Sequence, residues 1–197
     1  MQQIYFWGRR VARRAAPVLA MGGLVGSLLG APAWAQAPAW VAATAGSPQQ
    51  LSGNSEVQGT AVDASGNVLV VGYFSGQVAF GTTMLTSAGG TDLFVAKWNP
   101  TTNAYVWAQR AGSNNNEFVF GLVVQGSSIY IVGQFYGITA TFGSTTLTSQ
   151  FGYAGYVAKL TDSGGSAAFA WAQQAGGAGL DYAYGLVRVG TQLYVGG

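Results

Sequence analysis

The sequence contains no cysteine and no histidine among its 197 residues. Without cysteine, the chain can form neither a disulfide framework nor a thiolate metal site. Without histidine, it lacks the base of most nucleophile–base pairs, and a Ser–His–Asp triad cannot be built. We therefore expect no catalytic residue, no cofactor and no metal site within these residues.

Charge is also scarce, at 7% of the residues, and it is unevenly distributed. Four of the eight basic residues lie near the N-terminus: Arg9, Arg10, Arg13 and Arg14. Without that segment, four basic and six acidic residues remain, a net charge of −2. No basic patch is left to hold a phosphate backbone, so nucleic acid is not an expected partner.

The N-terminal residues have the pattern of an export signal. A basic start is followed by an apolar run of 16 residues, "AAPVLAMGGLVGSLLG", which is short for a membrane span, and then by the small residues of "APAWAQA". We predict a signal peptide over 1–35 with cleavage after Ala35, and a secreted, extracellular or cell-surface protein with no stable membrane span after cleavage. Two alternatives stay open: a twin-arginine signal, although "VAR" after the arginine pair lacks the usual apolar residues, and an uncleaved N-terminal anchor helix.

Glycine is plentiful, with 31 residues, and an internal repeat is visible. The segment 56–113 returns as 117–177, and a third copy begins with "DYAYGLVRVGTQLYVGG" at 181–197. We divide the chain into an N-terminal segment (36–55), repeat units over 56–116 and 117–180, and the start of a third unit at 181–197.

Each unit is predicted to contain four main β-strands. In the first unit these are "VQGTAVD", "VLVVGYF", "DLFVAKW" and "YVWAQRA", with a short excursion, "QVAFGTTMLTS", after the second. Asp63, Gly66 and Asn67 suit a tight hairpin turn. The same "DASGN" resembles part of a calcium loop, but it has too few oxygen ligands, and a turn explains it better.

The strands are apolar on both faces, since "VLVVGYF" does not alternate with polar residues. Both faces of each sheet should therefore be covered, as in stacked small antiparallel sheets. We predict an all-β fold, a β-propeller of four-stranded antiparallel blades of which about two and a half are present; a linear array of β-sandwich or solenoid repeats is the alternative. Gly72, Gly133 and Gly196, inside the second strands, should mark a bulge or a close backbone approach.

A copy of the fourth strand, "WVAATAGS" at 40–47, precedes the first unit. Propellers close by pairing an N-terminal strand with the last blade, which removes two open sheet edges. The copy is thus expected to be an outer closing strand. A ring of six to eight such blades needs roughly 370 to 500 residues, so we expect an N-terminal fragment of a longer protein.

The pattern "AVDASGNVLVVGYF…FVAKW…WAQ.AG" resembles the bacterial SBBP (seven-bladed beta-propeller) repeat family. The resemblance covers roughly 40–197, and "D-x-x-G-N-V-x-V-x-G" is whole only in the first unit. It implies a propeller in an exported bacterial protein. The family carries no agreed catalytic residues.

Three acids, Glu56, Glu117 and Asp181, open the three units at equivalent positions of the repeat. In a propeller they would form a ring on one end face, able to bind a cation or a sugar hydroxyl; the competing interpretation is that they are solvated turn residues. Lys97 and Lys159 are expected to point to solvent. The recurring tryptophans, Trp40, Trp107 and Trp171, are expected to be packing anchors rather than sugar-stacking residues.

These patterns favour an exported module that binds or scaffolds at the cell surface or outside the cell, with an unidentified protein or glycan as partner. The alternative is part of a secreted polysaccharide-acting enzyme whose catalytic residues lie beyond residue 197.

Overall fold

The computed structural model describes residues 49–150, 152–177 and 181–197, and it is all-β. The predicted signal peptide and the copy of the outer strand at Trp40 lie outside these residues. Within them, no helix has the length and hydrophobicity needed to cross a membrane.

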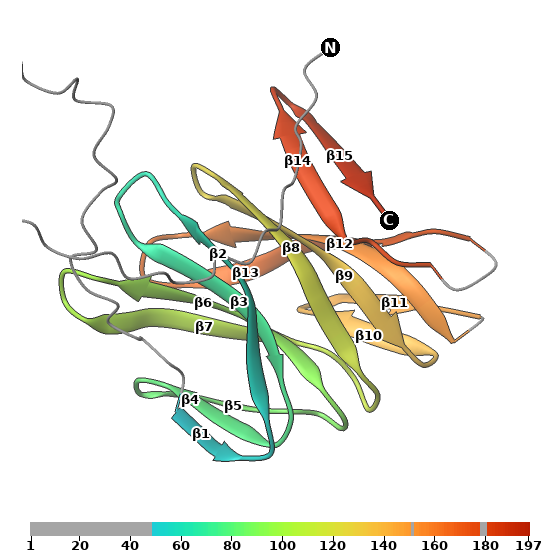
Figure 1. Ribbon diagram of the computed structural model, residues 1–197, viewed down its shortest axis with the longest axis horizontal. Helices are drawn as coiled ribbons and strands as arrows, with labels where there is room; N and C mark the ends of the chain where they lie inside the picture. The colour runs from blue at the N-terminus through green and yellow to red at the C-terminus, as the bar shows by residue number, and fades with distance from the viewer. Residues whose placement is uncertain (1–48, 151, 178–180) are drawn as a thin grey trace, which may run out of the picture. The chain divides into compact units, whose positions relative to one another are not determined.

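Two four-stranded antiparallel sheets, one per repeat unit, dominate the described chain (Figure 1). The first sheet has the order β2 (Ser55–Val62), β3 (Val68–Phe74), β6 (Asp92–Asn99) and β7 (Ala104–Ala111). The second has the order β8 (Glu117–Gln125), β9 (Ser128–Tyr136), β12 (Tyr153–Asp162) and β13 (Ala167–Ala175). The four predicted main strands of each unit are confirmed, each sheet running as a simple meander.

The excursion of each unit is a separate two-stranded hairpin, as the sequence suggested. It consists of β4 (Gln77–Phe80) with β5 (Thr83–Thr86) in the first unit, and of β10 (Thr139–Phe142) with β11 (Thr145–Thr148) in the second. A strand that was not predicted, β1 (Gln49–Ser52), adds to the edge of β4. The third unit contributes the hairpin β14 (Gly185–Val189) and β15 (Gln192–Gly196).

A bulge interrupts the first strand of both sheets at the same place. On β2 it lies between Val57, which pairs with Gly72, and Gly59. On β8 it lies between Val119, which pairs with Gly133, and Gly121. The predicted bulge opposite the interior glycines is therefore confirmed.

Only glycine fits opposite these bulges. A Cβ on Gly72 would overlap the carbonyl oxygen of Glu56, and one on Gly133 would overlap that of Phe118. In the third unit the matching residue is Gly197, whose Cβ would overlap the carbonyl oxygen of Tyr182, whereas a Cβ on Gly196 would meet nothing within 4 Å. The prediction of Gly196 as the third interior glycine was wrong by one residue.

Both faces of the first sheet are buried, as predicted from its apolar strands. Leu69 and Val71 of β3 join one hydrophobic core, and the alternate residues Val70 and Phe74 join another. The second of these cores includes Val78 and Phe80 of β4, and so lies under the excursion hairpin.

The first core continues into the second sheet, where it includes Ile129 and Ile131 of β9. Paired strands place Ile129 at the position of Val68, and Ile131 at that of Val70. The core thus joins the Leu69 face of the first sheet to the opposite face of the second. Successive units pack head to tail, a mode of association that repeats in one direction.

Candidate functional site

The three candidate acids do not share one position. Ser55 pairs with Phe74 as Glu117 pairs with Phe135, so Ser55 is the counterpart of Glu117, and Glu56 is one residue further along its strand. The sequence alignment missed this shift because glutamate opens both segments.

Glu56 is exposed on β2, and both of its carboxylate oxygens are engaged. The Tyr73 hydroxyl donates a hydrogen bond to Oε2 and the Gln58 amide donates one to Oε1, each at 2.6 Å. The hydrogen bond to Glu56, together with burial, raises the pKa of Tyr73 above its ordinary value.

Glu117 and Asp181 do share a local role, which is to close the turn after an outer strand. The backbone N–H of Ser113 donates to Glu117 at 2.9 Å, and that of Gly177 donates to Asp181 at 2.8 Å. Both bonds span four residues. The solvated-turn interpretation fits Asp181, which is half-buried, but not Glu117, which is fully buried.

Glu117 lies beside a second buried carboxylate, Asp92 at the start of β6. Asp92 forms an ion pair with Arg110 and accepts a hydrogen bond from the Ala88 N–H at 3.0 Å, both through Oδ2. Its Oδ1 is buried without a hydrogen-bond partner among the described residues. Burial raises the pKa of Asp92, although Arg110 and Ala88 oppose the shift.

Burial also raises the pKa of Glu117, to about 7, against the opposing hydrogen bonds from Ser113 and with a further contribution from the charge of Asp92. A shared environment that keeps one acid protonated near neutral pH is typical of paired carboxylates. Glycosidases use such pairs, but there the carboxyl groups touch the substrate. Asp92 and Glu117 are both 0% exposed, so a substrate cannot reach them in this structure.

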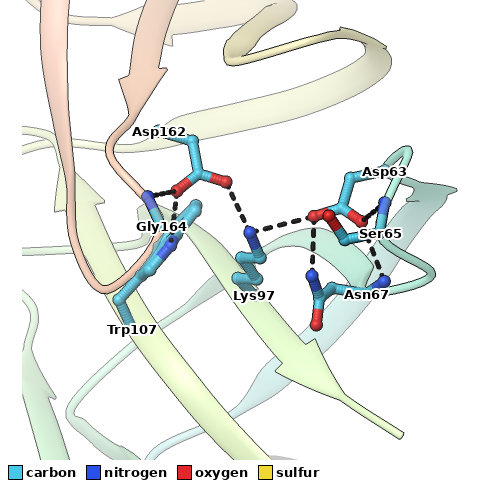
Figure 2. Close-up of polar contacts among 7 residues, drawn as sticks. All are labelled: Asp63, Ser65, Asn67, Lys97, Trp107, Asp162 and Gly164. Atoms are coloured by element: carbon cyan, nitrogen blue, oxygen red, sulfur yellow. Dashed lines mark hydrogen bonds and ion pairs between the residues drawn. The ribbon is translucent and has the colours of Figure 1, made fainter.

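Lys97 lies between Asp162 and Asp63 in a network of polar contacts (Figure 2). Its Nζ lies 2.9 Å from Oδ2 of Asp63, on a turn of the first sheet, and 2.7 Å from Oδ2 of Asp162, at the end of β12 in the second. Asp162 Oδ1 also accepts hydrogen bonds from the Trp107 indole N–H at 3.2 Å and the Gly164 N–H at 2.8 Å. The network therefore ties the two sheets together.

The prediction that Lys97 points to solvent was wrong, because the residue is only 6% exposed. Burial alone lowers the pKa of Lys97, but its bonds to Asp162 and Asp63 outweigh burial and raise it. A signal was present in the sequence: "DLFVAKWN" is apolar on both faces, and a lysine inside such a strand needs a charged partner. The interpretation of Trp107 as a packing anchor is confirmed, since it is 4% exposed in the core.

Asp63 confirms the turn interpretation of "DASGN". Its Oδ1 accepts the backbone N–H groups of Ser65 and Asn67 at 2.8 and 2.9 Å, and its Oδ2 accepts the Asn67 side-chain amide at 2.8 Å as well as Lys97. Burial alone raises the pKa of Asp63, but these hydrogen bonds outweigh it and hold the pKa well below its ordinary range. Within the described ranges, no group of three or more acidic side chains is placed to hold a metal ion.

Seven aromatic rings, two of them exposed, form a continuous row. Neighbouring ring centroids in the row lie between 4.5 and 6.4 Å apart. We call the row the aromatic belt; in order, it consists of Tyr73, Phe118, Phe120, Tyr184, Tyr182, Tyr153 and Tyr136.

The aromatic belt is held by β8, by residues 182–184 just before β14, and by single residues of β3, β9 and β12. "EFVFG" and "DYAYG" place aromatic residues two apart, and in both segments the two rings stack. This alternation was a signal that sequence reasoning passed over. Tyr184 is 56% exposed and Tyr136 is 40% exposed, while the other members are half-buried. At one end, Tyr73 bonds Glu56, so the belt ends beside an exposed carboxylate.

The aromatic belt is therefore the candidate binding surface. Its rings offer apolar faces, and its tyrosines add hydroxyl groups at their rims. No protein-family model matches this chain, and no curated protein matches it in sequence. The resemblance of its repeats to the seven-bladed propeller family therefore stays a prediction.

Proposed function

We propose that this chain is an exported β-propeller repeat module that binds a glycan along the aromatic belt and has no catalytic site of its own. The belt is the observation that carries the proposal. Pyranose rings present apolar C–H faces that stack on aromatic side chains, and their hydroxyl groups hydrogen-bond to carboxylates and phenols. A belt that ends in Tyr73 and Glu56 offers both kinds of contact.

The propeller part of the proposal is supported by the head-to-tail packing of the two sheets and by the position of β1. Gln49 pairs with Ala79 on β4, and Gly112, just after β7, pairs with Thr141 at the same position of β10. The residues that follow each fourth-strand sequence therefore run beside the next excursion hairpin. This agrees with 40–47 being the outer strand of a preceding blade.

The alternative is that the chain is part of a secreted polysaccharide-acting enzyme. The aromatic belt would then hold substrate for catalytic residues beyond residue 197. The fully buried state of Asp92 and Glu117 favours the non-catalytic module for the residues described.

The test is binding of the full chain to a panel of immobilised polysaccharides, followed by titration calorimetry with the glycan retained. We expect Tyr184→Ala to weaken binding at least about tenfold, because it removes the most exposed ring of the belt. Tyr194→Ala is the matched control, since Tyr194 is 52% exposed on β15 and is not part of the belt. Equal affinities of the two variants, or no retained polysaccharide, would overturn the proposal.

A further inference from the structure

Each four-stranded sheet carries a cross-strand row with a central lysine and a tryptophan on one face. In the first sheet, Leu69, Lys97 and Trp107 are paired across β3, β6 and β7. In the second sheet, Tyr130, Lys159 and Trp171 are paired in the same way across β9, β12 and β13. The two rows occupy equivalent positions and share the lysine and the tryptophan, but Tyr130 stands where the first sheet has Leu69, and the surroundings of the rows differ.

The second sheet supplies the hydrogen-bond acceptor for the lysine and the tryptophan of the first row. Asp162, the last residue of β12, accepts hydrogen bonds from both the ammonium group of Lys97 and the indole N–H of Trp107. Lys97 also forms an ion pair with Asp63, on a turn of its own sheet. Two carboxylates thus balance one buried lysine.

The row of the second sheet lacks both acids. The counterpart of Asp63 is Gln125, because Val62 and Val124 precede them in equivalent register. Lys159 forms no ion pair among the described residues, and it lies with Arg188 against Tyr130, at 5.9 and 5.7 Å from the ring centroid. Two cations therefore gather here with no carboxylate between them.

The surface is also only partly covered. A cavity between the second sheet and the hairpin β14–β15 is lined by Tyr130, Val157, Trp171, Arg188 and Leu193, among others. Repeat spacing places Leu193 at the position of Ile129, so the hairpin supplies the beginning of the cover that the first sheet receives. In the second unit, Asp162 lies at the end of the third main strand, β12, just before the turn to the fourth, β13. Residues 181–197 supply counterparts of the first two main strands, β14 and β15.

We propose that the face formed by Tyr130, Lys159 and Trp171 binds a further repeat unit of the same kind, whose turn equivalent to Asp162–Gly164 places a carboxylate between Lys159 and the Trp171 indole. This inference rests on the propeller part of the proposed function. A second copy of the chain is the poorer occupant, because its Asp162 is already bonded to its own Lys97.

The test lengthens the full chain with a copy of its own residues 134–177 after Gly197, which completes a third unit. The appended segment then contains an aspartate equivalent to Asp162. We expect the lengthened chain to unfold at a higher urea concentration than the parent. Exchange of the Trp171 indole proton, followed by NMR, should slow at least about tenfold, as befits a hydrogen-bonded indole.

A double-mutant cycle identifies the contact. In the lengthened chain, Lys159→Met and Asp→Asn at the appended aspartate should each reduce the folding equilibrium constant about tenfold, and the pair together no more than either alone. In the parent chain, Lys159→Met should change that constant less than about twofold.

Four outcomes would overturn the inference. The first three are a lengthened chain no more stable than the parent, additive effects in the cycle, and a large effect of Lys159→Met in the parent. The fourth is a parent chain that dimerises through Lys159 in sedimentation experiments, which would assign the face to a second copy. Failure here leaves glycan binding by the aromatic belt intact, and loss of glycan binding leaves this cycle unaffected, so the two proposals fail separately.

Discussion

Lys97 and Asp162 form an ion pair between the two sheets, with Nζ and Oδ2 2.7 Å apart, although 65 residues separate them in the chain. Asp63 approaches the same ammonium group from the first sheet at 2.9 Å. Because all three side chains are more than nine-tenths buried, none can exchange its partner for water at low cost. The ion pair therefore holds the two units together.

Removing the Lys97 ammonium group should strongly destabilise the folded chain. We expect Lys97→Met to lower the free energy of unfolding by about 3–5 kcal/mol, because it leaves two buried carboxylates without a counter-charge. Urea denaturation followed by tryptophan fluorescence measures this. Lys159→Met is the control, at the equivalent position without acidic partners, and should change stability by less than about 0.5 kcal/mol. Similar losses of unfolding free energy in the two variants would contradict a special role of Lys97 in holding the units together.

Glu117 should make stability fall as pH rises. Its folded pKa, about 7, lies above the ordinary value of 4.5, so the folded state binds its proton more tightly than the unfolded state does. The stabilisation is complete below pH 4.5 and is lost by about pH 7, with a change of roughly 3 kcal/mol. Glu117→Gln should flatten this slope in urea midpoints measured from pH 4.5 to 8. An unchanged slope in the variant would show that another group titrates.

The interior glycines should be intolerant of any side chain. Gly133→Ala places a Cβ against the carbonyl oxygen of Phe118, and we expect a loss of about 3 kcal/mol or more in the free energy of unfolding. Gly196→Ala is the control, since nothing lies within 4 Å of its Cβ position. If thermal melts show both variants as stable as the parent, the bulge does not restrict this position.

Export should leave a mature chain that begins at Gln36. We expect mass spectrometry of the protein from the culture medium or cell surface to give this N-terminus. Ala35→Leu should block processing, because the cleavage region requires small residues. A full-length N-terminus in the membrane fraction of the parent would instead support the anchor-helix alternative.

Much of the local structure was readable from the sequence. Runs such as "VLVVGYF" predicted strands buried on both faces, and the structure has two hydrophobic cores on the two faces of β3. Asp63 and Gly66 predicted a tight turn, which forms with Gly66 at a φ of 81°. Such features depend on residues close in sequence, whose geometry is set by local sterics and hydrogen bonds.

Register was less readable. "LYVGG" offers two adjacent glycines, and only the pairing of Gly185 with Gly196 shows that Gly197 faces the carbonyl of Tyr182. A similar error of one residue paired Glu56 with Glu117 in the sequence comparison, whereas the counterpart of Glu117 is Ser55. Five residues separate Val62 from its partner Val68, whereas four separate Val124 from its partner Ile129, so the spacing between the two units changes by one residue at this turn.

The sequence by itself determined the repeat, the strands and the turns, because apolar periodicity and turn residues act over a few positions. Only the tertiary structure decided that Lys97 is buried between two acids, that Glu117 lies beside Asp92, and that seven aromatic rings form one belt. Those relationships join residues from different strands and units. Their energies depend on burial and on distances that no local pattern specifies.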